Sequence, residues 1–295
     1  MTIQYYIKKP FKQDFEQNAK LLYACFADAV QTSLPTVLHS HHDRLELVYI
    51  SEGQGLHRIG NGLYHTKAND LLIFNNNVLH DECANPNTGM SIYTCAVKNI
   101  NLSDMRENEI ISDNFEPILH CSDQGKIIKN IFEGMIGQLA NDCCDADNIC
   151  QYLLSALLLV ITRQVPKTRK AFSLRESELV IRIKQYIDDH YLEALTLDGL
   201  SEKLNMSDSY LSHKFKNFTG FAPMEYIIRR RIGKAQSLLI STDKSITAIA
   251  AEVGYENNSY FNTLFKKMVR KTPLDYRRYY VGIEQYNKLN RLSKF

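Results

Sequence analysis

Basic side chains in the C-terminal part of this 295-residue chain are suited to phosphate chemistry. Arg229, Arg230, Arg231 and Lys234 fall in a stretch that we expect to be a helix from Pro223 to about Ile240. Guanidinium and ammonium groups commonly contact the phosphates of nucleic acids. Residues 1–175 hold 16 Lys and Arg against 19 Asp and Glu, whereas residues 176–295 hold 19 against 14. The net positive charge therefore favours contact with a polyanion in the C-terminal part.

The thiols are the second group with possible chemistry, and all seven cysteines precede residue 151. They are Cys25, Cys83, Cys95, Cys121, Cys143, Cys144 and Cys150. Their odd number and the absence of a Cys-x-x-Cys pair indicate free thiols in a reducing cytoplasm. Redox sensing by residues 143–150 stays an open alternative. The most apolar stretch, residues 153–161, is about half of what spans a bilayer, so we expect no membrane contact.

Two similar units must position the basic residues, because the C-terminal part contains an internal repeat. Leu197, Leu200, Ser201 and Leu204 match Ile246, Ile249, Ala250 and Val253 at an offset of 49, and Tyr210-Leu211, Phe215-Lys216 and Pro223 match Tyr260-Phe261, Phe265-Lys266 and Pro273 at an offset of 50. One additional residue in the second turn accounts for the change of offset. Thr196, Ser207 and Ser245, with Asn257 or Asn258, are suited to start the four helices. Each unit is therefore predicted to be a helix-turn-helix.

Residues 180–280 closely resemble the AraC/XylS family of transcription regulators. The resemblance rests on Ile249 to Tyr255, Ser259-Tyr260-Phe261, Phe265-Lys266-Lys267 and Thr272-Pro273 with Tyr276-Arg277. It implies sequence-specific binding of double-stranded DNA by both units and activation of transcription through RNA polymerase. Position by position, it implies base contacts from Ser209, Ser212 and His213 in the first unit and from Asn258, Ser259, Asn262 and Thr263 in the second. We also expect Lys216, Lys266 and Arg230 to contact the DNA. The family often has Arg where this chain has His213 and Thr263, so the target sequence stays open.

Short apolar runs with Gly and Asn turns predict strands between residues 45 and 97. Leu45 to Ile50, Leu71 to Phe74 and Ile92 to Val97 are such runs, and Gly60-Asn61-Gly62 favours a hairpin. This spacing is typical of an antiparallel barrel or sandwich.

Residues 35–97 also resemble the cupin barrel, through His39-x-His41-x4-Glu46-x6-Gly53 and through Asn69-Asp70 to His80. In cupin enzymes the matching His and Glu residues hold a divalent metal, and three imidazoles with one carboxylate suit iron, manganese, nickel or zinc. Three interpretations stay open: polar groups of a ligand pocket, structural histidines, or a metal site. We favour an effector pocket formed by His39, His41, Glu46, Tyr49 and His80, without a bound metal or cofactor.

The expected fold is α+β, with a cupin-like antiparallel β-barrel plus helices followed by an all-α domain with two helix-turn-helix units. The expected domains are an effector-sensing barrel (1–122), a helical dimerisation segment (123–165), a linker (166–175), the DNA-binding domain (176–283) and a tail (284–295). The helices of residues 123–165 are apolar enough either for a homodimer interface or for plain packing on the barrel.

The predicted function is a cytoplasmic DNA-binding transcription regulator, an activator without enzymatic activity, that responds to a small-molecule effector. Two alternatives stay open: a metal-dependent cupin enzyme fused to a DNA-binding module, and a constitutive regulator with a structural barrel. No phosphate-binding loop, catalytic triad pattern or dinucleotide fingerprint occurs in the sequence.

Overall fold

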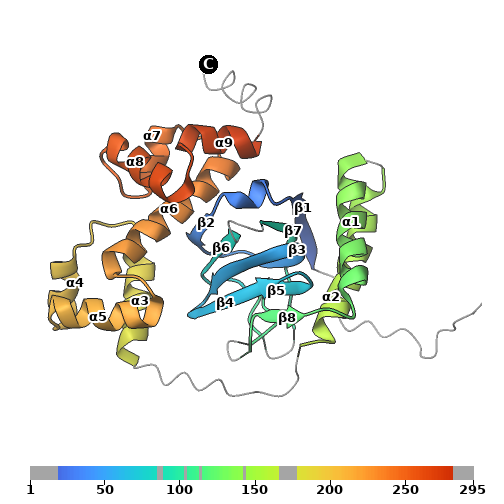
Figure 1. Ribbon diagram of the computed structural model, residues 1–295, viewed down its shortest axis with the longest axis horizontal. Helices are drawn as coiled ribbons and strands as arrows, with labels where there is room; N and C mark the ends of the chain where they lie inside the picture. Colours follow the sequence, from blue (N-terminus) through green and yellow to red (C-terminus); the bar gives the residue numbers. More distant parts are fainter. Residues whose placement is uncertain are drawn as a thin grey trace, which may run out of the picture.

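The computed structural model describes residues 19–84, 89–102, 105–112, 115–141, 144–165 and 178–281, which form a sheet-rich part and a helical part (Figure 1). The strands are β1 Lys20–Ala27, β2 Thr36–His39, β3 Leu45–Ile59, β4 Gly62–Lys67, β5 Asp70–Phe74, β6 His80–Ala84, β7 Met90–Lys98 and β8 Ile118–His120, with a short 3-10 helix, Gln31–Ser33, before β2. Every pairing between these strands is antiparallel, as predicted. The predicted linker and tail lie outside the described residues.

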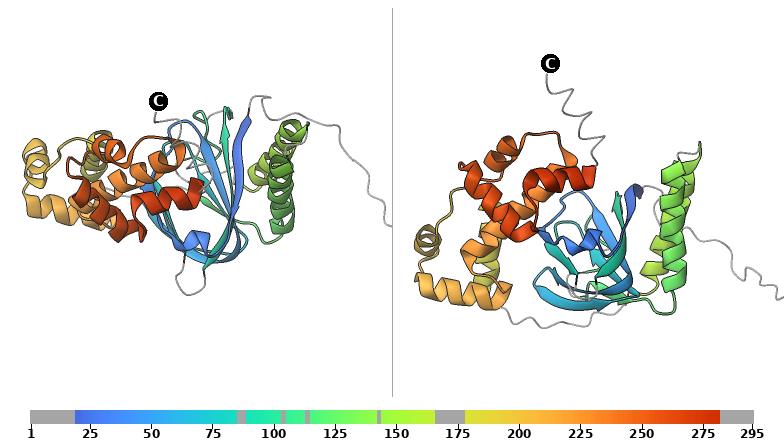
Figure 2. Two further views of the ribbon diagram at one scale, coloured as in Figure 1. Left: turned by 90° about the horizontal axis from the view of Figure 1, so that it is seen from above. Right: turned by 45° about the horizontal axis from the view of Figure 1, so that its top comes forward.

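The long strand β3 organises the sheet by changing partners along its length. Its first part pairs with β5 and β7, and its second part pairs with β4 and β6. The β3–β4 hairpin turns at Gly60, whose φ of 59° suits the predicted turn. Strand β2 pairs with β6 and β1 pairs with β7. The sheet consequently curls into the expected barrel (Figure 2).

Alternation along β3 divides its side chains between two cores. Leu45 and Leu47 pack outward with two helices, α1 Gly125–Asn141 and α2 Ala146–Thr162. Val48 and Ile50 pack inside the barrel. The two helices lie on the side of the sheet opposite the helical part (Figure 1). Because both faces of the first part of β3 are buried, the sequence pattern could not tell which face the helices cover.

Seven described helices form the C-terminal part: α3 Glu178–His190, α4 Leu197–Leu204, α5 Asp208–Thr219, α6 Pro223–Ser241, α7 Ile246–Glu252, α8 Asn258–Val269 and α9 Pro273–Val281. Helix α6 runs between the unit of α4 and α5 and the unit of α7 and α8 (Figure 1). Among the described residues, no helix combines the length and the apolar character needed to cross a membrane.

The barrel and the helical part are joined through β2, which lies against α6. Val37 and Leu38 of β2 belong to the same apolar core as the C-terminal helices. Val37 N donates to Gln236 Oε1 at 2.8 Å, and Gln236 Nε2 donates to Pro35 O at 3.1 Å. Gly233 permits this approach, since an added Cβ would lie 2.3 Å from Leu38 O. The two parts are therefore packed together by specific, buried contacts.

Candidate functional site

The four helices of the two helix-turn-helix units begin at the residues expected to cap them. The side-chain oxygens of Thr196, Ser207, Ser245 and Asn257 each accept the backbone N–H three residues later, over 3.0–3.4 Å. These bonds satisfy N–H groups that have no partner within a helix. The start of each recognition helix, α5 and α8, is thereby fixed.

The recognition helices bury one face and expose the other. Leu211 and Phe215 of α5 and Phe261 and Phe265 of α8 have no exposed surface. The opposite faces carry the predicted DNA-contacting side chains: Ser209, His213 and Lys216 are exposed and Ser212 is half-buried, while Ser259, Asn262, Thr263 and Lys266 are exposed and Asn258 is half-buried. Asn258 Nδ2 donates to Thr247 Oγ1 at 3.3 Å. Both surfaces are thus free of the protein core, as base-reading helices require.

Arg230 does not lie on such a surface, which corrects its predicted contact with phosphate. Its side chain is 6% exposed, and its Nε lies 3.0 Å from Asp188 Oδ1. The guanidinium also lies over the ring of Tyr191, 4.5 Å from the centroid. Arg231 is likewise engaged, donating to the carbonyls of Tyr191 and Gly254 at 2.6 and 3.0 Å. These arginines tie α6 to α3 and the segment after it and, through Gly254, to the second unit, because a guanidinium fork suits carbonyls and carboxylates as well as phosphates.

Inside the barrel, four of the predicted pocket residues meet. His41 Nε2 and His80 Nε2 lie 3.3 and 3.5 Å from Glu46 Oε2. His39 stacks near His80, with ring centroids 4.3 Å apart. One potential ligand atom from each of the four residues lies within 4.8 Å of the others. Strand β2 and the following loop supply His39 and His41, β3 supplies Glu46, and β6 supplies His80.

Tyr49 is not part of this cluster, and its predicted place in the pocket is wrong. It lies three residues after Glu46, so strand alternation turns it to the opposite face. There its hydroxyl donates to Asn69 Oδ1 at 2.9 Å, and its ring packs in the core under α1 and α2. The cluster instead contains Tyr23 of β1, whose hydroxyl donates to Glu46 Oε1. Sequence reasoning missed Tyr23 because no pattern in residues 20–27 marked a strand.

Burial and neighbouring charges shift the pKa of three groups in and beside the cluster. Burial alone would raise the pKa of Glu46, but its interactions with the imidazoles of His41 and His80 outweigh it and hold this pKa well below its usual range. Burial, followed by the neighbouring imidazoles, holds the pKa of His39 well below its usual range. Nearby, burial and the charge of Glu46 raise the pKa of Glu82 to about 8. A carboxyl with a raised pKa is protonated more readily, and in that form it donates as well as accepts.

A cavity of about 650 Å³ opens beside this cluster, between the barrel and helices α6 and α9. Its polar wall includes His39, His41, Arg44, Glu46 and Glu82. The apolar wall is formed by Phe26, Leu34, Met90 and Ile92. The helical wall is formed by Gly233, Gln236, Ser237 and Ile240 of α6 and by Tyr276 and Tyr280 of α9. A molecule in this cavity would touch both parts of the chain. Neither α6 nor α9 was predicted from sequence to contribute to the pocket.

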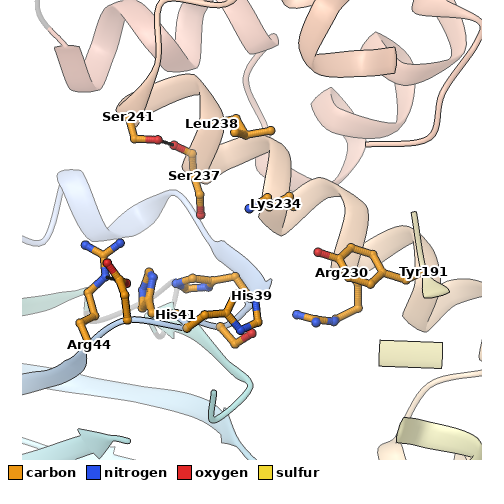
Figure 3. A pocket seen from close by; sticks show the side chains of 12 residues that line it. His39, His41, Arg44, Tyr191, Arg230, Lys234, Ser237, Leu238 and Ser241 are labelled. Atoms are coloured by element: carbon orange, nitrogen blue, oxygen red, sulfur yellow. Dashed lines mark hydrogen bonds and ion pairs between the residues drawn. The ribbon is translucent and has the colours of Figure 1, made fainter. Parts of the chain in front are cut away.

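A smaller hollow of about 290 Å³ is also lined by His39 and His41. Figure 3 shows these histidines and Arg44 on the barrel side, facing Lys234, Ser237 and Ser241 of α6. Both spaces therefore lie along the same domain boundary and share His39, His41, Arg44, Ser237 and Ser241 in their walls.

Three of the described thiols, all buried, are poorly suited to redox sensing. Burial raises the pKa of the Cys121 thiol to about 11, and it raises the pKa of Cys95 and Cys150 as well. A thiol with a raised pKa is a weak nucleophile at neutral pH. Cys143 lies outside the described residues.

The donor set of the barrel cluster fits a divalent transition metal in kind. It offers three imidazoles and one carboxylate, and the Nε2 atoms of His41 and His80 are buried without a hydrogen-bond partner. Imidazole and carboxylate ligands are those used by zinc, iron, manganese and nickel sites.

Two family models match the chain: an AraC-like ligand binding domain over residues 37–161 and a helix-turn-helix domain over residues 200–279. The HTH-type transcriptional regulator YdiP from Escherichia coli K12 is 28% identical over 244 residues, which is 81% of this chain and 80% of that relative. The HTH-type transcriptional activator RhaS from Salmonella paratyphi B is 25% identical over 275 residues, 90% and 95% of the two chains. The structure of ToxT from Vibrio cholerae O395 is 14% identical, with 92% and 100% covered and a TM-score of 0.45. With both its domains matched in order, the chain belongs to the AraC family of transcription regulators.

Proposed function

We propose that this DNA-binding regulator reads its operator with α5 and α8 and senses its effector in the cavity between the barrel and helices α6 and α9. The observation that carries the proposal is the composition of the cavity walls, which come from the barrel and from the DNA-binding part together. An effector bound there would contact α6, the helix that separates the two helix-turn-helix units (Figure 1).

For DNA contact we propose the exposed polar side chains of the two recognition helices. His213 and Asn262 would read base edges, and Lys216 and Lys266 would contact phosphates. The 19 residues of α6 correspond to about 28 Å of helix, near the ~34 Å between successive major grooves. The two units are thus suited to two boxes about one helical turn apart.

For the effector we propose an amphiphilic small molecule. The cavity has room for a small metabolite, and its wall is divided between charged groups near Glu46 and an apolar side near Phe26 and Ile92. A polar head would meet His41, Arg44 or the carboxyl of Glu82, while an apolar body would fill the remainder.

Regulation then follows from a preference of the effector for one docking of the barrel on α6. A ligand shifts an equilibrium only by its difference in affinity for the two arrangements. Since α6 lies between the two helix-turn-helix units (Figure 1) and is tied to the second one through Arg231 and Gly254 O, a change of docking would be transmitted to their spacing.

The proposal includes a cytoplasmic homodimer that activates transcription by contacting RNA polymerase and catalyses no reaction. Activation is supported by the similarity to RhaS, which is named as a transcriptional activator. Dimerisation through residues 123–165 is supported by exposed apolar side chains on α2, where Ile149 is 38% and Tyr152 79% exposed.

The decisive experiment is selection of bound sequences from a random DNA pool by the full chain. We expect enrichment of a site with two boxes about one helical turn apart. A variant with both His213→Ala and Asn262→Ala should enrich no such site, although it retains binding to random DNA at low salt. Enrichment of an unchanged site by this variant would refute the assigned readers, and no enrichment by the wild type would refute the function.

Sensing is tested by thermal unfolding with a set of cytosolic metabolites, comparing the wild type with Thr94→Phe, which would fill part of the cavity. A bound effector raises the unfolding midpoint of the wild type alone. If no metabolite shifts the midpoint, the barrel is a structural element only.

A further inference from the structure

A second contact joins the barrel to the first helix-turn-helix unit, apart from the contact between β2 and α6. Arg58 of β3 reaches Phe221 in the turn after α5, and its guanidinium carbon lies 4.6 Å from the centroid of that ring. An added Cβ at Gly220, the C-cap of α5, would lie 2.7 Å from Arg58 Nη2. The charge of Arg58 is therefore placed at the C-terminal end of the first recognition helix, where the free carbonyl groups favour a cation.

Each side of this contact is held in place by its own part of the chain. In the barrel, the backbone N–H of Arg58 donates to Asp81 Oδ1 at 2.8 Å. In the helical part, the guanidinium carbon of Arg229 lies 4.1 Å from the centroid of the Phe221 ring, and Arg229 donates to Glu225 Oε1 at 3.0 and 3.1 Å. An aromatic ring attracts cations that lie over it. One arginine from the barrel and one from α6 thus contact the same ring.

The side chain of Arg58 serves this contact rather than the fold of the barrel. Its Nε is buried without a hydrogen-bond partner among the described residues. Burial lowers the pKa of Arg58, and the charge of Arg229 lowers it further. Because an unpaired buried donor costs free energy, the barrel gains no stability from placing the guanidinium there. We therefore expect the barrel to fold without this side chain.

The barrel holds the second unit through a different strand. Strand β2 contacts α8, the second recognition helix, as well as α6. Leu38 of β2 belongs to the same apolar core as Phe261 and Phe265 of α8. Strands β2 and β3 are joined through β6, which pairs with both of them. A single sheet therefore touches the first unit at Arg58 and the second unit at β2.

We propose that the barrel braces the two helix-turn-helix units against each other, and that Arg58 thereby determines which spacing of the two operator boxes the protein accepts. The inference rests on the proposed reading of two boxes by α5 and α8. One base-pair step along DNA is about 3.4 Å. A first unit shifted by that distance away from the barrel would carry Phe221 beyond the ~6 Å range of its attraction to the guanidinium. The brace therefore penalises operators whose boxes are one base pair too close or too far apart.

Spacing selectivity is tested with the full chain on the site that the wild type selects and on the same site with one base pair inserted or removed between the boxes. The loss of affinity on the altered sites should be at least about threefold smaller for Arg58→Ala than for the wild type. Lys67→Ala is the matched control, since Lys67 is an exposed cation on the neighbouring strand β4, and it should behave like the wild type. Equal losses in the wild type and Arg58→Ala would overturn the brace, as would an equal weakening on all three sites.

Phe221→Leu tests the other side of the contact by removing the aromatic ring. It should relax the spacing as Arg58→Ala does, and the double variant should relax it no further, because both changes remove one interaction. Additive effects of the two substitutions would overturn the direct coupling between Arg58 and Phe221.

The brace is also tested without DNA, by amide hydrogen exchange of the full chain. In Arg58→Ala, exchange should become faster in residues 215–222 at the end of α5, and α8 should not change. Unchanged exchange in residues 215–222 would overturn the brace. The two proposals fail in different ways: a wild type that selects no two-box site refutes the proposed function and the spacing role with it, whereas a two-box site that Arg58→Ala reads with unaltered spacing selectivity refutes the brace alone.

Discussion

At the scale of single residues, the type of a side chain does not tell whether it serves the surface or the core. Arg230 and Lys216 are both basic and both lie in the DNA-binding part, but Arg230 is buried beside Asp188 whereas Lys216 is exposed on α5. Only the exposed group is available to a phosphate. We therefore expect substitution of Arg230 to affect stability and substitution of Lys216 to affect DNA affinity.

Replacing Arg230 with Ala should act on stability rather than on DNA recognition. The carboxylate of Asp188 loses the buried guanidinium but keeps Lys184, whose Nζ lies 2.7 Å from Asp188 Oδ2, so the expected cost is about 1.5–3 kcal/mol. Tyr226 also donates to this carboxylate, at 2.8 Å. We expect a lower midpoint of thermal unfolding and an unchanged dependence of DNA affinity on salt. A flatter salt dependence would instead restore Arg230 as a phosphate contact.

His213→Ala and Lys216→Ala should separate base reading from phosphate contact. Loss of His213 should cost about 1–3 kcal/mol on the selected site and little on random DNA. Loss of Lys216 should weaken binding to both DNAs. It should also reduce the slope of log affinity against log salt concentration by about one, because one phosphate contact is lost. Fluorescence anisotropy at several salt concentrations measures both effects. An equal loss on the two DNAs from His213→Ala would remove it from the base readers.

His57 predicts a dependence of barrel stability on pH. It has no exposed surface, and burial lowers its pKa to about 4. The unfolded chain, with an ordinary pKa near ~6.5, therefore binds a proton at a higher pH than the folded chain does. The contribution of neutral His57 to the free energy of unfolding is therefore fully present above pH ~6.5. It is lost as the pH falls towards 4, and the loss amounts to up to about 3 kcal/mol. When the pH is lowered from 7.5 to 5, the thermal stability of His57→Leu should fall less than that of the wild type. His65→Leu, at an exposed position, is the control and should behave like the wild type. Equal losses in all three proteins would show that His57 is not the origin of the pH dependence.

At the scale of elements, the close contact between β2 and α6 depends on Gly233, which has no side chain. Gly233→Ala would place a Cβ 2.3 Å from Leu38 O and 2.8 Å from Val37 O, both of which are backbone atoms. Alanine favours the helix itself by about 1 kcal/mol, so α6 should stay intact while the barrel is displaced. We expect faster amide exchange in residues 36–39 and a DNA response that no longer depends on the effector.

Gly137→Ala is the control for this substitution, because a Cβ at Gly137 in α1 would meet nothing within 4 Å. It should leave exchange and regulation unchanged. Unaltered exchange in β2 of the Gly233→Ala protein would show that the close approach is not required for docking.

At the scale of the whole molecule, the helices on the far side of the sheet leave apolar surface uncovered. Ile149 and Tyr152 are one turn apart on α2 and are 38% and 79% exposed. Tyr152→Glu should shift the proposed homodimer towards monomer in sedimentation experiments, since a buried unpaired carboxylate opposes association. Leu63→Glu is the matched control, because Leu63 is an exposed apolar residue of β4, 54% exposed. An equal shift by both variants, or by neither, would place the interface elsewhere.

The sequence by itself determined the architecture of both parts, because their signals are local. Caps such as Thr196 and Ser245 and the turn residue Gly60 act within three or four positions of the chain, and the repeat places the same unit twice. Spacing also identified His39, His41, Glu46 and His80, which do meet in the barrel.

Tertiary structure alone decided which residues share a surface. The alternation of side chains along β3 decided which face of the sheet Tyr49 occupies. The packing of α3 on the helices beside it decided that Arg230 is buried. The contact of Gly233 and Gln236 with β2, and with it the shared cavity, joins residues about 200 positions apart. No local pattern encodes such a pairing, because its free energy arises only when both surfaces are already folded.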